Sequence, residues 1–190
     1  MNKILLYGSG VHSEVVQELA LSVGFEVVTI FDDLTNPYKG NFLVEFPLLI
    51  SIGDNQNRAK IANLVNHSFV TLISPKSYIS ESTTIGEGTI ILPFSVVHTK
   101  AIIGKHVILN SSSVIEHHCQ IADYVHIAPN ATLCGNITVG EKTLIGANAT
   151  VIQGINIGAN CVIGAGTVVI TDVPDNAVVV GNPGRIIKMN

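Results

Sequence analysis

The stretch "IGANATVIQGINIGANCVIGAGTVV", residues 145–169, carries an aliphatic side chain at every sixth position: Ile145, Val151, Ile157, Ile163 and Val169. The same spacing runs back without a gap to residue 79, through sixteen positions that are all Ile, Leu or Val. Six-residue repeats are typical of a parallel β-helix, in which each hexad forms a short strand and a turn. We therefore predict a β-helix of about five coils, with three hexads to each coil.

The composition of each hexad indicates how its interior is filled. The aliphatic residue should point inward and stack on its equivalent three hexads away, where burial contributes about 1.5–3 kcal/mol per side chain. Four residues after it the side chain is mostly small, as at Ala131, Ala149 and Cys161, which suits a narrow prism. Glycine often follows it directly, as at Gly140 and Gly146, and we expect this glycine to relieve a turn with positive φ.

Residues 1–74 show a different pattern, in which strands alternate with helices. The expected elements are a strand over 3–10 that ends in glycine, a helix over 11–24, a strand over 25–33, a strand, turn and helix over 46–66, and a strand over 69–74. Such alternation predicts a small Rossmann-like parallel βαβαβ sheet. We place the junction near Ser74–Pro75, with a nucleotide-sugar-binding domain over 1–74 and the β-helix over 75–190.

Composition excludes several classes of function. Charged residues make up 13% of the chain and the net charge is −4, which argues against nonspecific nucleic-acid binding. We find no run of about 18 apolar residues that would span a membrane. The three cysteines, Cys119, Cys134 and Cys161, form no CxxC pair, so we expect reduced thiols in a cytoplasmic protein.

Polar and glycine-rich stretches follow the predicted strands of the first part, where α/β sheets bind their ligands. They cover residues 8–12, 32–33 and 52–58. Gly8 and Gly10 form a broken dinucleotide fingerprint, because its third glycine is replaced by Ser13. A glycine turn that opens a helix still offers N–H groups to a phosphate, and Asp32 or Asp33 could accept hydrogen bonds from a ribose or a base. An ordinary tight turn followed by a solvated acidic turn would leave the same pattern.

The second part carries two adjacent histidines in "NSSSVIEHHCQI", residues 110–121. Because one coil takes three hexads, we expect His98 to lie beside Glu116. His117 and His126 are half a coil apart and should occupy separate parts of the prism. They could meet only across an interface between chains, as a cyclic assembly would allow.

Two alternatives for these histidines stay open. Some trimeric hexapeptide-repeat proteins resemble γ-class carbonic anhydrases, which bind zinc through three histidines with a close His-x4-His pair. No two histidines of this part show that spacing, so we expect no metal site. Surface histidines on a purely structural solenoid are the second alternative.

Taken in order, six stretches resemble the sugar O- and N-acetyltransferase family of left-handed β-helix acyltransferases. The likeness is strongest to bacterial UDP-4-amino-sugar N-acetyltransferases of the bacillosamine pathway. The stretches are "YGSGVHSEVV" (7–16), "FDD" (31–33), "SIGDNQNR" (51–58), "LNSSSVIEHHCQI" (109–121), "VHIAPNATLCGNITVG" (125–140) and "VVVGNPGRIIK" (178–188).

The resemblance implies a homotrimer with active sites between subunits, acetyl-CoA along the β-helix and a nucleotide sugar on the first domain. By position, His117 matches the general base and His126 a contact to acetyl-CoA from the neighbouring chain. Ala147 and Ala165 match positions whose backbone contacts the cofactor. The implied substrate contacts are Gly10, Val11 and His12 for the diphosphate, Asp32 and Asp33 for uridine, and Gly53 for the sugar nucleotide.

One position departs from the family. Glu or Asp usually follows the catalytic histidine and raises its basicity, but here the residue is His118. A neutral imidazole can orient its neighbour without stabilising a positive charge on it. Either the base is weaker here, or Glu116, Asp123 or a backbone carbonyl takes the role.

The implied reaction is acetyl transfer from acetyl-CoA to the 4-amino group of a nucleotide-linked 4-amino-4,6-dideoxy sugar, with UDP as the expected nucleotide, for bacterial glycan biosynthesis. It would proceed by direct transfer with His117 as general base and a backbone N–H at the oxyanion. O-acetylation of a sialic acid or related sugar is the alternative enzyme. A noncatalytic nucleotide-sugar-binding scaffold is the alternative from another class.

Overall fold

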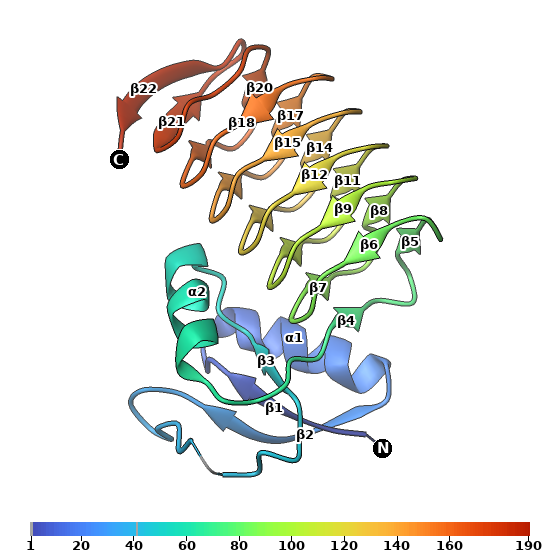
Figure 1. The fold of residues 1–190 in the computed structure, drawn as a ribbon, viewed down its shortest axis with the longest axis vertical. Helices are drawn as coiled ribbons and strands as arrows, with labels where there is room; N and C mark the ends of the chain where they lie inside the picture. The colour runs from blue at the N-terminus through green and yellow to red at the C-terminus, as the bar shows by residue number, and fades with distance from the viewer. Residues whose placement is uncertain (1, 41) are drawn as a thin grey trace.

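The computed structural model describes residues 2–40 and 42–190. An α/β part, blue to teal in Figure 1, packs against the end of a long β-solenoid that runs from green to red. Both parts of the predicted fold, the α/β domain and the left-handed parallel β-helix, are therefore confirmed.

The α/β part is built on a three-stranded parallel sheet in the order β2-β1-β3. Its elements are β1 (Asn2–Tyr7), α1 (Val11–Ser22), β2 (Phe25–Phe31), β3 (Leu48–Ile50) and α2 (Asn55–Leu64). Helix α2 begins where the Asp54 carboxylate accepts the N–H of Asn57 at 2.8 Å. The carboxyl ends of all three strands meet at one edge, which positions the loops after Tyr7, Phe31 and Ile50 side by side.

The segment predicted as a strand over 69–74 is divided between this sheet and the solenoid. Phe69 makes a single parallel bridge to Leu48, and the chain then leaves for the solenoid. There β4 (Leu72–Ile73) pairs with the strand at Ile90–Ile91, because that pairing satisfies its backbone while Leu72 enters a core shared by both parts. The predicted strand is thus present at Leu72–Ile73, but it belongs to the solenoid and not to the first sheet, and the solenoid begins at Leu72.

The solenoid is a three-sided prism. Its first face holds β4, β7 (Ile90–Ile91), β10 (Ile108–Leu109), β13 (His126–Ile127), β16 (Leu144–Ile145), β19 (Val162–Ile163), β21 (Ala177–Val180) and β22 (Arg185–Met189). The second face holds β5 (Tyr78–Ile79), β8 (Val96–Val97), β11 (Val114–Ile115), β14 (Thr132–Leu133), β17 (Thr150–Val151) and β20 (Val168–Val169). The third face holds β6 (Thr84–Ile85), β9 (Ile102–Ile103), β12 (Gln120–Ile121), β15 (Thr138–Val139) and β18 (Asn156–Ile157).

The short strands of the prism pair in parallel with the strands three hexads further along, as Ile108 does with His126. The second face has six strands and the third has five, so five to six coils replace the expected five. The aliphatic hexad positions from Ile91 to Val169 are at most 2% exposed, which confirms that they point inward. The small residues Ala131 and Ala149 are fully buried between them, as expected for a narrow interior.

The hexad glycines act differently from our expectation. Positive φ falls three residues after the aliphatic position, at residues such as His118 (φ 60°) and Asn148 (φ 56°), and not at Gly140 or Gly146. A Cβ on Gly140 would lie 2.4 Å from the backbone nitrogen of Ala159 in the next coil. These glycines are therefore needed for close stacking of neighbouring coils, because a side chain there would meet backbone.

The two parts of the chain share a hydrophobic core. Helix α1 lies between the sheet and the solenoid (Figure 1), and its Leu19 packs in one cluster with Leu6 of β1 and with Ile90 and Ile108 of the first face. Ile90 and Ile108 point out of the prism, yet both are fully buried. Their burial joins the parts into a unit.

An aromatic group closes the same junction. The His106 ring is 3% exposed and stacks on Tyr124 with ring centroids 5.3 Å apart, while Phe69 meets it edge-on at 4.4 Å. Burial, followed by the nearby Arg58 guanidinium, lowers the pKa of His106 to about 4. The ring is therefore neutral near pH 7.

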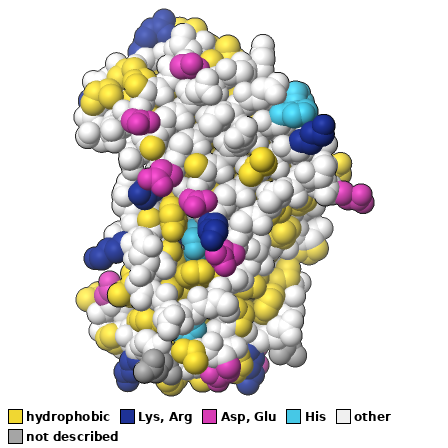
Figure 2. Space-filling view, viewed as in Figure 1, with side chains coloured by type: hydrophobic (Ala, Val, Ile, Leu, Met, Phe, Trp, Pro, Cys, Tyr) yellow, Lys and Arg dark blue, Asp and Glu magenta, His cyan; other side chains and the backbone are white. Residues whose placement is uncertain are grey.

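On the face seen in Figure 2, Lys and Arg side chains lie apart from one another, and several of them sit beside Asp or Glu. Within residues 2–40 and 42–190, no helix is both long and apolar enough to cross a membrane.

The close approach at Gly140 generates a stability prediction. Gly140→Ala should lower the free energy of unfolding by about 1–3 kcal/mol, because backbone on the next coil cannot give way. Gly40→Ala is the control, since nothing lies within 4 Å of a Cβ there, and it should change stability by less than about 0.5 kcal/mol. Urea denaturation measures both, and equal effects would contradict the stacking argument.

His106 generates a pH prediction. Its folded pKa of about 4 lies below the unfolded value of 6.5, so below pH 6.5 the unfolded chain binds a proton that the folded chain excludes. The stability contribution is complete above pH 6.5 and is lost as the pH falls toward 4. His106→Asn, which keeps a residue suited to φ 53°, should lose less stability between pH 7 and pH 4.5 than the unaltered chain. Equal losses in denaturation series would refute this.

Candidate active site

A hollow of about 580 Å³ opens at the carboxyl ends of β1, β2 and β3. It is lined by Tyr7, Gly8, Ser9, Gly10, Val11, His12, Asp32, Asp33, Leu34, Ser51, Ile52 and Gly53. All six residues expected to contact the nucleotide sugar are among them: Gly10, Val11, His12, Asp32, Asp33 and Gly53. The structure thus brings together three stretches that are far apart in the sequence, while their contacts with a ligand stay a prediction.

The two aspartates of this cavity are not equivalent. The Asp32 carboxylate accepts the N–H groups of Leu34 and Thr35 at 2.8 and 2.6 Å and also the Thr35 hydroxyl, and these bonds lower its pKa to about 2. Asp33 accepts one hydrogen bond, from the Tyr7 hydroxyl at 2.7 Å, and burial together with this carboxylate raises the pKa of Tyr7 to about 12. Asp32 therefore shapes the loop, and the exposed Asp33 is the freer partner for a ligand.

His12 is the second residue of α1 and lines the cavity. Its Nε2 is buried and has no hydrogen-bond partner among the described residues. Burial, and then the Arg58 charge, lower its pKa, so the ring is neutral near pH 7. A neutral ring nitrogen without a partner is a suitable contact for a polar ligand atom.

His126 lies beside His12, with ring centroids 6.4 Å apart. Its Nε2 is 3.2 Å from the Asn110 amide nitrogen, and the Asn110 oxygen accepts the N–H of Ser111 at 2.9 Å, which orients the amide to donate. Burial, Arg58 and His12 lower the pKa of His126 to about 4. Within one chain His126 thus lies next to this cavity and lines a neighbouring hollow that shares Gly53 with it. Its expected contact with acetyl-CoA stays a prediction.

His117 and His118 lie in the turn between β11 and β12, on the edge between the second and third faces. Their Nδ1 atoms are 3.1 Å apart, within hydrogen-bond distance, and the tautomers of the two rings set which one donates. The His117 ring packs over Gly135, where a Cβ would lie 2.4 Å from Cε1 and 2.6 Å from Nε2. With Nδ1 turned toward His118, Nε2 is the ring nitrogen of His117 that lies over Gly135.

The other suggested partners of His117 bond elsewhere. Glu116 faces His98 at 3.6 Å, which confirms the expected stacking of these two residues. Asp123 accepts the backbone N–H of Lys105 at 2.7 Å. His118 is therefore the side chain that bonds to His117 in this structure.

Ala147 and Ala165 lie one above the other on the edge between the first and second faces. The Ala147 carbonyl already accepts the N–H of Gly166 at 2.8 Å. Within one chain this edge is separate from the His117 edge.

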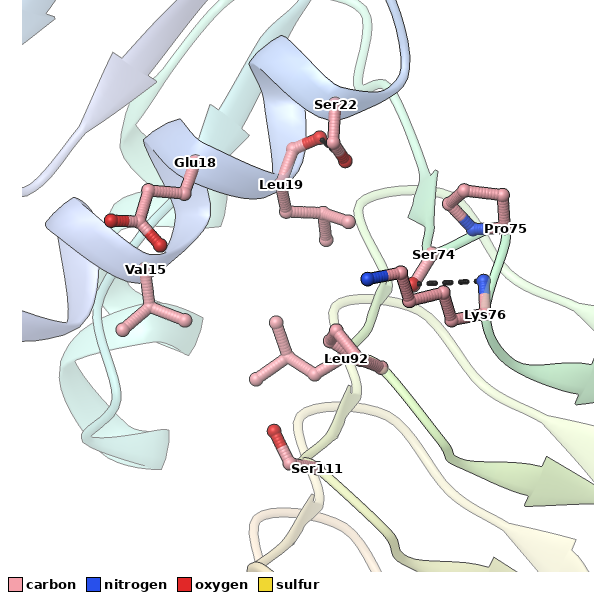
Figure 3. A pocket seen from close by; sticks show the side chains of 10 residues that line it. Val15, Glu18, Leu19, Ser22, Ser74, Pro75, Lys76, Leu92 and Ser111 are labelled. Carbon is pink, nitrogen blue, oxygen red and sulfur yellow. Dashed lines mark hydrogen bonds between the residues drawn. The ribbon is translucent and has the colours of Figure 1, made fainter.

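A second hollow of about 360 Å³ lies between α1 and the first coils (Figure 3). Val15 and Leu19 face Leu92 across it, with Glu18 and Lys76 among the lining residues. It includes none of the predicted site residues. Across the described ranges, no group of three or more His, Cys, Asp or Glu side chains is arranged to hold a metal ion.

Sequence reasoning missed the role of one residue that organises the site, Arg58, and placed a second, Gly135, without giving it a role. Arg58 is fully buried and donates to the carbonyls of Ile52 and Gly53, both at 3.0 Å. Gly135 leaves space for the His117 ring. The stacking of successive coils indicated Gly135, whereas no spacing rule indicates a buried arginine whose partners are carbonyls.

Comparison with known proteins agrees with both parts of the chain. Residues 3–65 match the family "PglD N-terminal domain", residues 100–135 match "Bacterial transferase hexapeptide (six repeats)", and residues 129–171 match "Hexapeptide repeat of succinyl-transferase". A UDP-N-acetylbacillosamine N-acetyltransferase of Bacillus subtilis (strain 168) is 35% identical over 110 residues, 47% of this chain. The chain spans about half, 51%, of that relative's length.

Solved structures match almost the whole chain, and two examples follow. PerB of Caulobacter crescentus, in complex with CoA and GDP-perosamine, is 31% identical with a TM-score of 0.91, covering 99% of this chain and 98% of that one. The acetyltransferase domain of PglB from Neisseria gonorrhoeae FA1090, in complex with acetyl coenzyme A, is 30% identical with a TM-score of 0.88, covering 98% of this chain and 100% of that one. The chain belongs to the family of hexapeptide-repeat sugar N-acetyltransferases with a PglD-type N-terminal domain.

Proposed function

We propose that this protein transfers the acetyl group of acetyl-CoA to the 4-amino group of a nucleotide-linked 4-amino-4,6-dideoxy sugar, with UDP as the expected nucleotide. The observation that carries the proposal is the single cavity that collects Gly10–His12, Asp32–Asp33 and Gly53 beside His126. The relatives support it, because one is a UDP-N-acetylbacillosamine N-acetyltransferase and one binds CoA and GDP-perosamine.

His117 is the general base in this proposal. Its Nε2 takes a proton from the amine as the new N–C bond forms and the C–S bond of the thioester breaks, and the proton then passes to the leaving thiolate. A positioned base of this kind contributes about 10²–10⁴-fold. Among the related structures are two variants of the Caulobacter enzyme in which one histidine is replaced.

His118 orients this base. The Nδ1 atoms of the two rings are 3.1 Å apart, so His118 holds the His117 ring by a hydrogen bond. In this pair no buried carboxylate takes part in proton transfer. A neutral partner gives less stabilisation to a protonated His117 than an acid would. An amine acceptor suits this pair, because a hydroxyl is much harder to deprotonate.

The active site belongs to a homotrimer in this proposal. The substrate cavity and His126 lie at the first face, His117 lies on the edge between the second and third faces, and Ala147 and Ala165 lie on another edge. No single chain assembles all three groups, whereas a cyclic assembly places different edges of neighbouring prisms together. Oligomer mass in solution is a simple check, since a stable monomer would exclude such a site.

The decisive experiment is a thiol-release assay with acetyl-CoA across UDP-, dTDP- and GDP-linked 4-amino-4,6-dideoxy sugars. We expect turnover with the UDP-linked 4-amino sugar and none with its 4-hydroxy counterpart. Turnover of a sialic acid would favour the O-acetyltransferase alternative. Acetyl-CoA binding without turnover on any sugar would favour a noncatalytic scaffold.

The histidine pair generates a second prediction. At saturating substrates His117→Ala should lower kcat by about 10²–10⁴-fold and retain acetyl-CoA binding. Gly135→Ala should also lower kcat, because the added methyl group displaces the His117 ring. His118→Glu, which restores the usual acid, should keep or raise kcat. Turnover of His117→Ala near that of the unaltered enzyme would exclude His117 as the base.

A further inference from the structure

The first turn of α2 lies along one edge of the solenoid, between its third and first faces. At this edge each coil turns through one residue with positive φ, and four of these residues follow one another at intervals of one coil. They are His106 (φ 53°), Tyr124 (φ 61°), Lys142 (φ 58°) and Asn160 (φ 55°). We call these four residues the turn ladder.

Arg58 forms hydrogen bonds to two residues of the turn ladder. Its Nε donates to the His106 carbonyl and its Nη2 to the Tyr124 carbonyl, both at 2.8 Å. The Nη1 atom of Arg58 donates to the carbonyls of Ile52 and Gly53 in its own domain, at 3.0 Å each. None of the described carboxylates forms an ion pair with it, so this fully buried cation is stabilised by carbonyl and amide oxygens alone.

Two neighbouring side chains form hydrogen bonds to the next two residues of the turn ladder. The Asn55 amide donates to the Lys142 carbonyl at 3.0 Å, and its oxygen accepts from Arg58 at 2.8 Å. Gln56 donates to the Asn160 side chain at 2.9 Å. The segment Asn55–Arg58 therefore contacts four successive coils, although the sequence suggested a ligand-binding role for it.

From this geometry we infer that Arg58 and Asn55 are positioning residues, which set the register of the nucleotide cavity along the solenoid and thereby the alignment of acceptor and acetyl group. The inference rests on the proposed function, because its consequence is measured as transfer. Arg58 acts through Gly53, whose carbonyl it holds and which lines the cavity.

Hydrogen bonds are needed for this register because the shared core does not specify it strongly. Apolar contact is non-directional, and the first face repeats similar aliphatic side chains at Ile90 and Ile108. A slip by one coil would move the cavity by about 4.8 Å. A misplacement of about 1 Å can already slow a reaction about 10²-fold.

The inference separates transfer from nucleotide binding. Most of the cavity wall, Gly8–His12 and Asp32–Leu34, follows β1 and β2 and is not held by Arg58. Weakening the hydrogen bonds of Arg58 and Asn55 to the turn ladder should leave nucleotide affinity nearly intact and slow the transfer step.

Arg58→Lys tests this, because an ammonium keeps the charge but cannot reach carbonyls on both sides as a planar fork does. We expect kcat to fall at least about tenfold, with the dissociation constants of UDP and GDP, measured by calorimetry, changing less than about threefold. Asn55→Ala, which removes one ladder contact, should show a smaller fall of the same kind. Arg185→Lys is the matched control, since exposed Arg185 bonds only the adjacent Gly184 carbonyl, and its kcat should not change.

Unchanged kcat in both variants would overturn the inference. So would loss of nucleotide binding in step with kcat, which would show that Arg58 merely keeps the domain folded. Hydrogen exchange supplies a readout independent of the substrate: in Arg58→Lys, amides of residues 51–55 should exchange faster while those of β1 stay protected. If the unaltered enzyme acetylates no sugar, the proposed function fails and this exchange pattern alone decides the inference; unchanged exchange would overturn it.

Discussion

Every coil of the solenoid repeats after three hexads, and the parallel strand pairing that enforces this register determines where each side chain of the prism lies. It stacks the inward Ile and Val side chains into one dry core. It places His98 on Glu116 and the His117 ring on Gly135. It also lines up the carbonyls that the first domain binds. The positions of the His117–His118 turn and of the domain junction are therefore consequences of one backbone repeat.

The same register explains two kinds of constraint in the hexad turns. Residues with positive φ recur three positions after the aliphatic residue, and Asn and His fill several of them because short polar side chains tolerate this conformation best. His118 occupies such a position, which brings its ring back toward His117. The glycines, in contrast, allow neighbouring coils to approach, so their role is steric.

Burial controls the charge state around the cavity. Arg58 is a buried cation. The pKa values of His12, His106 and His126 are all lowered, first by burial and then by the nearby charge of Arg58. Their rings are neutral near pH 7 and act through hydrogen bonds and packing. The two aspartates that line the cavity, Asp32 and Asp33, have carboxylates with different hydrogen-bond partners.

By itself the sequence determined the prism, its inward residues and the βα pattern of the first part, because these depend on periodicity and on the stacking of equivalent hexads in successive coils. It also indicated the loops that form the cavity, since parallel strands end at one edge. The tertiary structure alone decided that Ile90 and Ile108 are buried, that Asp32 is used within its own loop, and that Arg58 binds carbonyls of both parts. These features depend on contacts between segments with no common period, so no local pattern encodes them.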